Sequence, residues 1–370
     1  MTTIPLRLGL QQRVMPGYRV AFFDTLAAAC TGGLGVFYGQ PRAEESIETG
    51  DELQLAVPAH ANNVHIFRGR GYFCLQPNFI PWLKKWQPEA LIVEANTRYL
   101  STPAAVEWMH HQQRPVIGWG LGAPDTNAIE STLRSRFLHS LDAVIAYSRT
   151  GADQYVATGT PPEQVFIAPN AVTFKPQAPI PQRPANFNAG KPCLLFVGRL
   201  QERKRIDLLL EACAALQQDF APRLIIIGEG PERFRLEQLA DQLYPDTEFV
   251  GAKYGLELEP YYLAADLFVL PGTGGLAVQQ AMTHALPVIV GVADGTQGEL
   301  VRSDNGWLLN ETSGTELERT LRQALSDIPR LRRMGLESHR IVTEEVNIEH
   351  MVDVFAKAVQ FAAAHLRKGI

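Results

Sequence analysis

Basic side chains gather in the segment VGRLQERKRID, which covers residues 197–207. The segment begins at the end of an apolar run, CLLFVG at 193–198, and Arg199 and Lys204 follow that run. Cations at the turn between a strand and a helix can bind a phosphate together with the amides at the helix N-terminus. The segment therefore predicts a phosphate site, and a solvated basic turn is the alternative interpretation.

Three more turns that contain glycine follow apolar runs in the same half of the chain. They are IIGEGPE at 226–232, FVGAKYG at 249–255 and LPGTGGLAVQQAM at 270–282. A glycine permits a tight turn or a close backbone approach, and any one of these turns alone is weak evidence. Because ligands of open parallel sheets bind beyond the carboxyl ends of the strands, we expect the four turns to share one edge.

Taken in order, these turns resemble the donor-binding half of the family-four retaining glycosyltransferases, which have the GT-B fold. That family shows VGRL with a lysine five residues after the arginine, then a GxGP turn, an FxG turn and a glycine-rich loop before an EAM-like helix start. The matching positions here are Val197–Leu200 with Lys204, Gly228–Pro231, Phe249–Gly251 and Gly272–Met282. Upstream, VFIAPNAVTF resembles the family's PN turn at the end of the N-terminal domain, and VMPGYRVAFFDTLA and GWGLG resemble segments of members that build bacterial surface polysaccharides.

The resemblance implies a role for each matching residue. Arg199 and Lys204 are the expected catalytic residues, since they would neutralise the diphosphate as it departs from the donor. The expected donor contacts are backbone amides and a few side chains. Gly228, Glu229, Gly251 and Lys253 would lie next to the nucleotide base, and Gly274, Gly275 and Leu276 next to the sugar and the phosphates. Gly17 would line the opposite side of the cleft.

The sequence departs from the family in the fourth loop. Family members carry two glutamates eight positions apart there, and this chain has Gly272 and Gln280. Gln280 can still accept a hydrogen bond from a ribose hydroxyl, whereas Gly272 supplies no side chain. We expect Gln280 to contact the ribose, and Asp294, just past a later strand, to replace the missing sugar contact.

A second departure concerns histidine. Many relatives have a histidine near the end of the strand that corresponds to 115–120, and this chain has Gly120, Leu121 and Gly122. No catalytic histidine is therefore assigned, and His110 and His111 are interpreted as a surface helix end. Glu94 and Asp125 are further acidic candidates beside the cleft.

Short apolar runs alternate with longer amphipathic stretches along the chain, which predicts an α/β protein with buried parallel strands. We expect two Rossmann-like doubly wound domains that face each other across a cleft. The prolines of Lys175–Lys191 indicate a linker. The predicted segments are an acceptor-side domain (1–175), the linker (176–190), a nucleotide-sugar-binding domain (191–346) and a closing helix (347–370). The expected strands lie at 35–39, 90–95, 115–120, 143–148, 164–169, 193–198, 223–228, 247–251, 267–272 and 286–291.

Composition limits the classes of function. The net charge of −5 over 370 residues argues against a nucleic-acid partner. Four scattered cysteines, no leader and no long apolar run favour a cytoplasmic protein. The segment NFIPWLKKWQ at 78–87 predicts either an anchor on the inner membrane face or a core helix with two exposed lysines.

The sequence contains no DxD, no HExxH and no Cys/His cluster with ligand spacing, so we expect no metal and no cofactor besides the nucleotide sugar as co-substrate. The resemblance implies a retaining transferase that moves a hexosyl group from a nucleoside-diphosphate sugar to a glycan or lipid-linked saccharide. A catalytically silent GT-B protein that binds nucleotide or a partner glycosyltransferase is the alternative, and an epimerase of the same fold is a second one.

Overall fold

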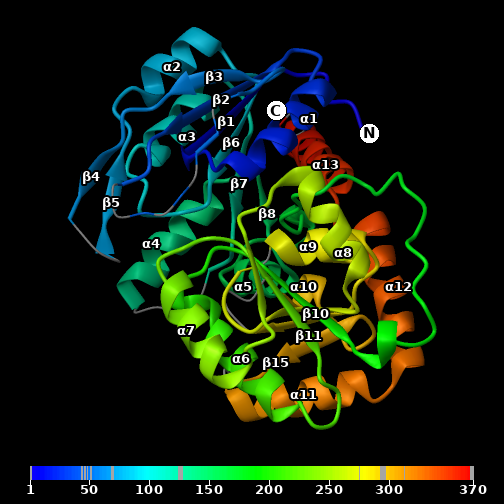
Figure 1. Cartoon of the computed structure of the whole chain (residues 1–370). Coiled ribbons are helices and arrows are strands. Elements are labelled where there is room, and N and C mark those ends of the chain that lie inside the picture. The colour runs from blue at the N-terminus through cyan, green and yellow to red at the C-terminus, as the bar shows by residue number, and fades with distance from the viewer. Residues whose placement is uncertain are drawn as a thin grey trace. The chain divides into compact units, whose positions relative to one another are not determined.

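The computed structural model describes residues 2–42, 45, 47, 49–50, 52–67, 71–123, 128–274, 276–291, 297–311 and 313–366 (Figure 1). The chain divides into two compact units. Unit 1 comprises Met1–Val172 and Ile348–Ile370, and unit 2 comprises Thr173–Asn347. The chain therefore leaves unit 1 after Val172 and returns to it at Ile348.

Unit 1 is built on a seven-stranded parallel sheet with the strand order β3-β2-β1-β6-β7-β8-β9. Its central strands are mostly apolar and almost entirely buried, as expected of a parallel sheet covered on both faces, but the strand Leu8–Val14 also buries Gln11, Gln12 and Arg13. The strands are β1 (Leu8–Val14), β2 (Leu34–Gly39), β3 (Val57–His60), β6 (Ala90–Glu94), β7 (Val116–Gly120), β8 (Ala143–Ala146) and β9 (Val165–Ile167). A separate antiparallel hairpin consists of β4 (Val64–Ile66) and β5 (Phe73–Leu75).

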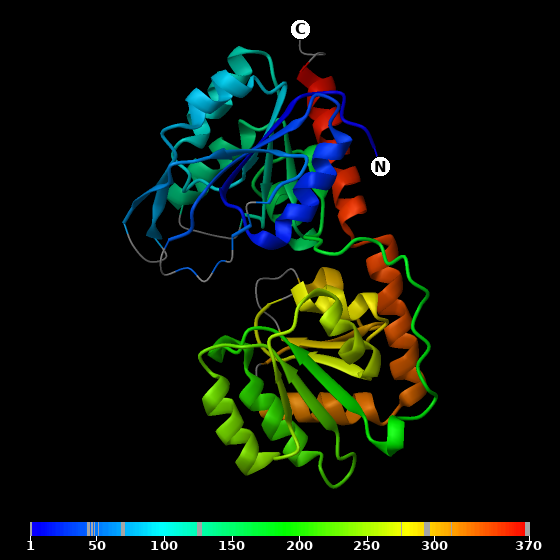
Figure 2. The same ribbon diagram turned by 45° about the horizontal axis from the view of Figure 1, so that its top comes forward.

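The helices of unit 1 are α1 (Val20–Ala29), α2 (Phe79–Trp86), α3 (Thr102–His111), α4 (Ala128–His139), α5 (Arg149–Ala157) and α13 (Ile348–Leu366). Figure 2 shows α13 beside α1, although more than three hundred residues separate them in the sequence. The ring of Phe355 on α13 lies 4.9 Å from the ring of Phe22 and 4.9 Å from that of Trp119. The last described helix thus completes the core of unit 1.

Helix α2 is the segment for which the sequence left two interpretations. Phe79 and Leu83 are completely buried, and the rings of Phe37, Phe79 and Trp82 stack on one another at 5.0 to 6.0 Å. Lys84 and Lys85 are exposed. The aromatic face of α2 therefore packs into the core of unit 1. In the described part of the chain, every helix is too short or too polar to span a membrane.

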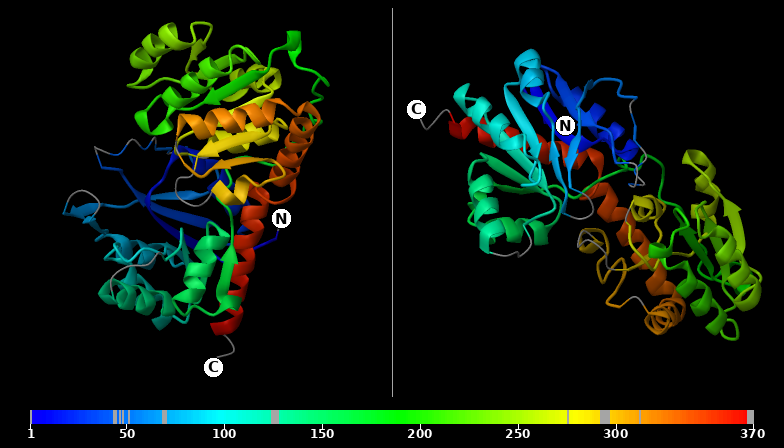
Figure 3. Two further views of the ribbon diagram at one scale, coloured as in Figure 1. Left: turned by 90° about the horizontal axis from the view of Figure 1, so that it is seen from below. Right: turned by 90° about the vertical axis from the view of Figure 1, so that its left-hand side faces the viewer.

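Unit 2 is built on a six-stranded parallel sheet with the order β12-β11-β10-β13-β14-β15, and helices cover its two faces (Figure 3). Its strands are β10 (Cys193–Val197), β11 (Arg223–Ile227), β12 (Glu248–Gly251), β13 (Leu267–Leu270), β14 (Val288–Gly291) and β15 (Gly306–Leu309). Its helices are α6 (Ile206–Ala215), α7 (Arg233–Leu243), α8 (Glu259–Ala264), α9 (Leu276–Thr283), α10 (Gln297–Leu300), α11 (Gly314–Leu325) and α12 (Ile328–Glu344). The predicted α/β class with two doubly wound sheets is confirmed.

Candidate functional site

The order of strands in unit 2 indicates where a ligand binds. From β10 the chain moves outward to β11 and β12, then returns to the other side of β10 to form β13, β14 and β15. Ligands of open α/β sheets bind in the crevice at such a reversal, beyond the carboxyl ends of the strands. The reversal lies between β10 and β13, and these two strands lead into the predicted basic turn and the predicted glycine-rich loop.

Lys204 and Thr273 connect these two turns directly. The Lys204 ammonium donates to the Thr273 carbonyl oxygen at 2.6 Å. Arg203 strengthens the connection, because its guanidinium donates to the Thr273 hydroxyl at 2.9 Å and its carbonyl accepts from the Thr273 amide at 3.0 Å. The sequence did not single out Thr273, since a lone threonine in a glycine-rich loop carries no distinctive signal.

Lys204 is a buried cation, with 9% of its surface exposed. Burial and the neighbouring Arg203 lower its pKa to about 8. Among the residues that the structure describes, no carboxylate forms an ion pair with Lys204. A buried charge without a counter-ion is unfavourable in the free protein, so the site favours an incoming anion.

Arg199 follows β10 and Gly198 at the same edge of the sheet. Its side chain is exposed, and it takes part in no ion pair within the described ranges. The structure thus brings an exposed and a buried cation to the end of one strand. Both predicted catalytic residues stand at the strand-order reversal.

Gly272 has a structural reason to be a glycine. A Cβ atom at this position would lie 2.1 Å from the Arg203 carbonyl oxygen and 2.6 Å from the Lys204 Cα. Any side chain would therefore push the basic turn away from the loop. The residue that replaces the first family glutamate is the one that lets these two turns meet.

The rest of the glycine-rich loop is also held close to Lys204. Gly274 has a φ of +133°, and a Cβ on it would lie 2.3 Å from the Lys204 ammonium nitrogen. Leu276 begins α9 and is 39% exposed. Gly275 and Asp294 lie outside the described residues.

A backbone hydrogen bond joins the two turns that are expected to bind the nucleotide base. The Gly228 amide donates to the Gly251 carbonyl at 2.9 Å. Glu229 forms an ion pair with Arg233, and Lys253 lies 3.4 Å from the Glu257 carboxylate. Since the side chains of Glu229 and Lys253 have partners of their own, backbone atoms are the groups that these turns leave available.

Gln280 lies on α9 and is exposed. Its amide oxygen accepts a hydrogen bond from the Tyr262 hydroxyl at 3.3 Å. Tyr262 comes from α8 and is almost completely buried. Sequence reasoning missed Tyr262, because an apolar stretch with a tyrosine is typical of a core helix.

Unit 1 has a strand-order reversal of its own, between β1 and β6. Gly17 follows β1 in a short 3₁₀ helix, Gly17–Arg19, and Glu94 ends β6. The Arg13 amide donates to the Glu94 carboxylate at 2.6 Å, and burial raises the pKa of Glu94. Asp125 lies outside the described residues. Among the acidic candidates, Glu94 therefore lies at the edge of the unit 1 sheet where the strands end.

Arg19 is a further charged residue at this edge that the sequence did not indicate. Its guanidinium donates to the Gln12 amide oxygen at 3.0 Å and to the Tyr147 hydroxyl at 2.6 Å, and it lies 4.1 Å from the centre of the Trp119 ring. A buried arginine next to a glycine turn resembles an ordinary surface arginine in sequence. Only the fold shows that it is enclosed.

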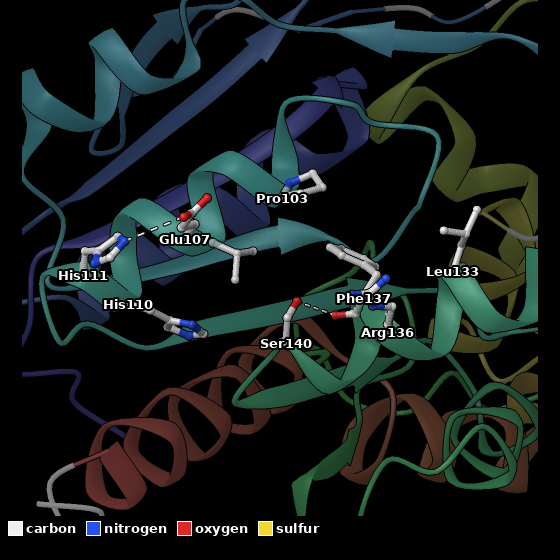
Figure 4. Close-up of a pocket in the computed structure, with 9 residues that line it drawn as sticks. Pro103, Glu107, His110, His111, Leu133, Arg136, Phe137 and Ser140 are labelled. Atoms are coloured by element: carbon white, nitrogen blue, oxygen red, sulfur yellow. Dashed lines mark hydrogen bonds and ion pairs between the residues drawn. The ribbon is translucent and has the colours of Figure 1, made fainter.

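His110 and His111 lie at the end of α3, away from the carboxyl edge of the sheet. They line a pocket of about 620 Å³ between α3 and α4, together with Val106, Phe137 and Arg136 (Figure 4). His110 pairs with Asp142 at 3.0 Å, which raises the pKa of the imidazole, and His111 is mostly exposed. This agrees with a surface helix end.

No group of three or more potential metal ligands occurs in the part of the chain that the structure describes.

Comparison with known proteins links this geometry to a family. Residues 180–340 match the model of the glycosyl transferases group 1. The chain is 38% identical over 123 residues to a GDP-mannose-dependent alpha-mannosyltransferase of Mycobacterium tuberculosis, which covers 32% of this chain and 30% of that protein. It is 30% identical over 325 residues to the sulfoquinovosyl transferase SQD2 of Arabidopsis thaliana. That match covers 76% of this chain and 61% of SQD2. The chain thus spans less than two thirds of either relative.

Solved structures extend the likeness over nearly the whole chain. The Anabaena protein HepE in complex with UDP superimposes with a TM-score of 0.70 at 15% identity, over 97% of this chain and all of that one. Sucrose-phosphate synthase from Thermosynechococcus elongatus gives a TM-score of 0.67 at 19% identity, over 97% and 99%. At such identities the likeness establishes the fold. The chain therefore carries a glycosyl transferases group 1 domain in residues 180–340, within a protein of the GT-B fold.

Proposed function

We propose that the protein is a retaining glycosyltransferase that moves a hexosyl group from a nucleoside-diphosphate sugar to a glycan or lipid-linked saccharide in surface polysaccharide synthesis. The observation that carries the proposal is Lys204, a buried cation without a carboxylate partner among the described residues, at the strand-order reversal of unit 2. Arg199 follows the same strand, β10, and its side chain is exposed. A diphosphate would supply the counter-charge that Lys204 lacks among the described residues.

In the proposed reaction, the bond between the anomeric carbon and the diphosphate oxygen breaks, and the acceptor oxygen bonds to the same face of the sugar. The leaving phosphate accepts the proton of the acceptor hydroxyl. Negative charge on the diphosphate grows as the bond breaks, so Arg199 and Lys204 stabilise the transition state more than the bound donor. No protein base and no metal ion is required.

The other donor contacts follow from the same placement. Gly274, Gly275 and Leu276 would approach the sugar and phosphate with backbone amides, and Asp294 would contact the sugar. Gln280 would contact the ribose.

We also propose a cytoplasmic location with peripheral contact to the inner membrane face, supported by the exposed Lys84 and Lys85.

A catalytically silent nucleotide-binding protein is the second candidate, and the replacement of both loop glutamates by Gly272 and Gln280 favours it. Such a protein would bind the donor without cleaving it. The two candidates therefore differ in turnover and agree in nucleotide binding.

The test is a donor panel of UDP-, GDP- and ADP-hexoses with membrane glycolipid as acceptor, applied to the wild type and to Arg199→Ala and Lys204→Ala. Each charge-assisted hydrogen bond contributes about 1.5–3 kcal/mol, so each variant should lose roughly ten- to a hundredfold in kcat/KM. Arg319→Ala on α11, also an exposed arginine, is the matched control for Arg199. If both site variants fold and transfer sugar at the wild-type rate, the proposed site is wrong. Donor binding without any turnover would favour the silent protein.

A further inference from the structure

Arg183 connects the proline-rich segment to the ends of two helices of unit 2. Its guanidinium donates to the carbonyl oxygens of Tyr262 at 3.0 Å and of His284 at 2.8 Å. It also donates to the carbonyl oxygens of Leu263, Ala265 and Ala285. These carbonyls belong to the C-terminal ends of α8 and α9, which have no partners inside their helices. One side chain therefore holds both helix ends.

Tyr262 extends this connection toward the candidate nucleotide site. Only 1% of its surface is exposed, and its ring stacks on that of His284 with the centres 4.8 Å apart. Its backbone is held by Arg183 and its ring by His284, so the position of its hydroxyl is fixed. That hydroxyl donates to the amide oxygen of Gln280 at 3.3 Å.

The contact determines what Gln280 presents to a ligand. A carboxamide is planar, so fixing its oxygen also fixes the direction of its NH₂ group. In the described part of the chain, the amide nitrogen of Gln280 has no hydrogen-bond partner, and the residue is exposed. Without the tyrosine, an exposed glutamine would lose side-chain rotamer freedom only when the ligand binds.

We propose that Tyr262 is a positioning residue for nucleotide recognition. Its hydroxyl holds the Gln280 amide with the oxygen turned inward, and the NH₂ group then donates to a ribose hydroxyl oxygen. The family glutamate at this position can only accept hydrogen bonds from the ribose when ionised, so the polarity of the contact is reversed here. This inference rests on the proposed function and deepens it, because it names the group that recognises the ribose.

The experiment compares nucleotide affinities by titration calorimetry. The probes are the tightest binder among UDP, GDP and ADP, and the 2′,3′-dideoxy analogue of the same nucleotide. The variants are Tyr262→Phe, Gln280→Ala and the double variant. Tyr244→Phe is the matched control, because Tyr244 is also buried in unit 2 and its hydroxyl donates to the Pro222 carbonyl at 2.5 Å, outside the proposed site.

Tyr262→Phe should raise the Kd of the ribonucleotide roughly two- to tenfold, which is the range for one neutral hydrogen bond, and leave the Kd of the dideoxy analogue unchanged. The double variant should bind like Gln280→Ala, since the hydroxyl acts through the amide. Tyr244→Phe should bind like the wild type.

Wild-type affinity in Tyr262→Phe would overturn the positioning role, and so would an equal loss for both probes, which is what a purely structural tyrosine gives. Failure of the proposed function has a different signature. Lys204→Ala would then keep full affinity for the nucleoside diphosphate, whichever way the Tyr262 variant behaves. A wild-type protein that binds none of the three nucleotides would overturn the proposed function and the positioning role together.

Discussion

At the scale of single residues, the candidate site combines a buried cation with glycines that lie against backbone atoms. Lys204 has lost hydration and has gained one carbonyl partner, Thr273. Its neighbour Gly272 leaves no room for a side chain. Both features make sense if an anion completes the site, and each leads to a measurable consequence.

The lowered pKa of Lys204 predicts how nucleotide affinity changes with pH. Burial and Arg203 lower that pKa to about 8, so the free protein loses the positive charge as the pH rises above this value. The Kd of the nucleoside diphosphate should therefore increase from about pH 8 upward, measured between about pH 6.5 and about pH 9.5. Lys204→Arg keeps its charge throughout and should show no such rise. An identical rise in that variant would assign the titration to another group.

The lowered pKa of Lys204 also affects folding, but here a rise in pH is favourable: it weakens nucleotide binding and increases the stability of the nucleotide-free protein. The pKa of Lys204 is lower in the folded protein than its ordinary value of 10.5, so the charged form opposes folding. This penalty is fully present below about pH 8. The free energy of unfolding of the nucleotide-free protein should therefore gain a favourable contribution as the pH rises from about 8 to 10.5. Chemical denaturation of the wild type and Lys204→Met across this window isolates the contribution, because the methionine variant has no such charge to lose.

Restoring the family glutamate at Gly272 should harm the protein. A Cβ at this position would lie 2.1 Å from the Arg203 carbonyl, so both Gly272→Ala and Gly272→Glu should lose about 1–3 kcal/mol of stability through overpacking. Nucleotide affinity should fall with it, because the basic turn moves. Thermal unfolding and nucleotide titration measure the two effects. Gly298→Ala is the control, since a Cβ at Gly298 would meet nothing within 4 Å. A stable and more active Gly272→Glu enzyme would contradict this account.

Chelation tests the proposal that Arg199 and Lys204 alone neutralise the diphosphate. Saturating EDTA should leave the transfer rate unchanged, because in the proposed site Arg199 and Lys204 would neutralise the leaving group without a metal ion. The rate is measured with the donor and acceptor identified in the panel. A loss of activity that magnesium or manganese alone restores would show that a metal ion takes part.

At the scale of elements, the regular strands could be predicted and the contacts between them could not. The apolar runs at 193–198, 223–228 and 267–272 correspond to β10, β11 and β13, since buried parallel strands are continuous in hydrophobicity. The sequence missed β1 (Leu8–Val14), because its buried polar residues interrupt the pattern. One of them, Gln11, is satisfied by Gln76, 65 residues away, which no local pattern reveals.

In the candidate site, too, some residues could be singled out from the sequence and others are revealed only by the fold. Arg199 and Lys204 could be singled out as candidates, because they follow an apolar run and because the turn resembles the VGRL and lysine motif of the family. Tyr262 and Arg183 could not, since each acts through carbonyls or an amide from distant parts of the sequence. Short motifs thus indicate candidate ligand-binding groups, whereas the contacts of Tyr262 and Arg183 emerge only from the fold.

Arg183 should stabilise unit 2 through the ends of α8 and α9. Arg183→Ala leaves several carbonyl oxygens without their donor, so we expect a loss of about 1.5–3 kcal/mol in the free energy of unfolding. Arg333→Ala, an exposed position on α12, is the control. Urea denaturation measures both variants. Equal stability of the two variants would mean that water replaces the guanidinium at no cost.

At the scale of the whole molecule, the chain forms two units with separate cores, and α13 belongs to the first of them. Phe355 packs between Phe22 and Trp119, so its contacts lie in unit 1. The proposed donor site lies in unit 2. A change at Phe355 therefore separates stability from nucleotide binding.

Phe355→Ala should lower the free energy of unfolding by about 3–5 kcal/mol, the usual cost of removing a buried phenylalanine side chain. The Kd of the nucleoside diphosphate, measured well below the unfolding temperature, should stay at the wild-type value. Lys357→Ala, at an exposed position of the same helix, controls for changes in α13 itself. A parallel loss of affinity in Phe355→Ala would show that the two units depend on each other.

The return of the chain to unit 1 also sets an order of events during synthesis. A ribosome completes the 175 residues from Thr173 to Asn347 before it makes Phe355, so unit 2 can fold while unit 1 still lacks its last helix. At typical elongation rates this interval lasts ~10–35 s. During that time Phe22 and Trp119 lack the ring of Phe355, so the apolar surface that α13 covers in the folded protein is exposed on the nascent chain.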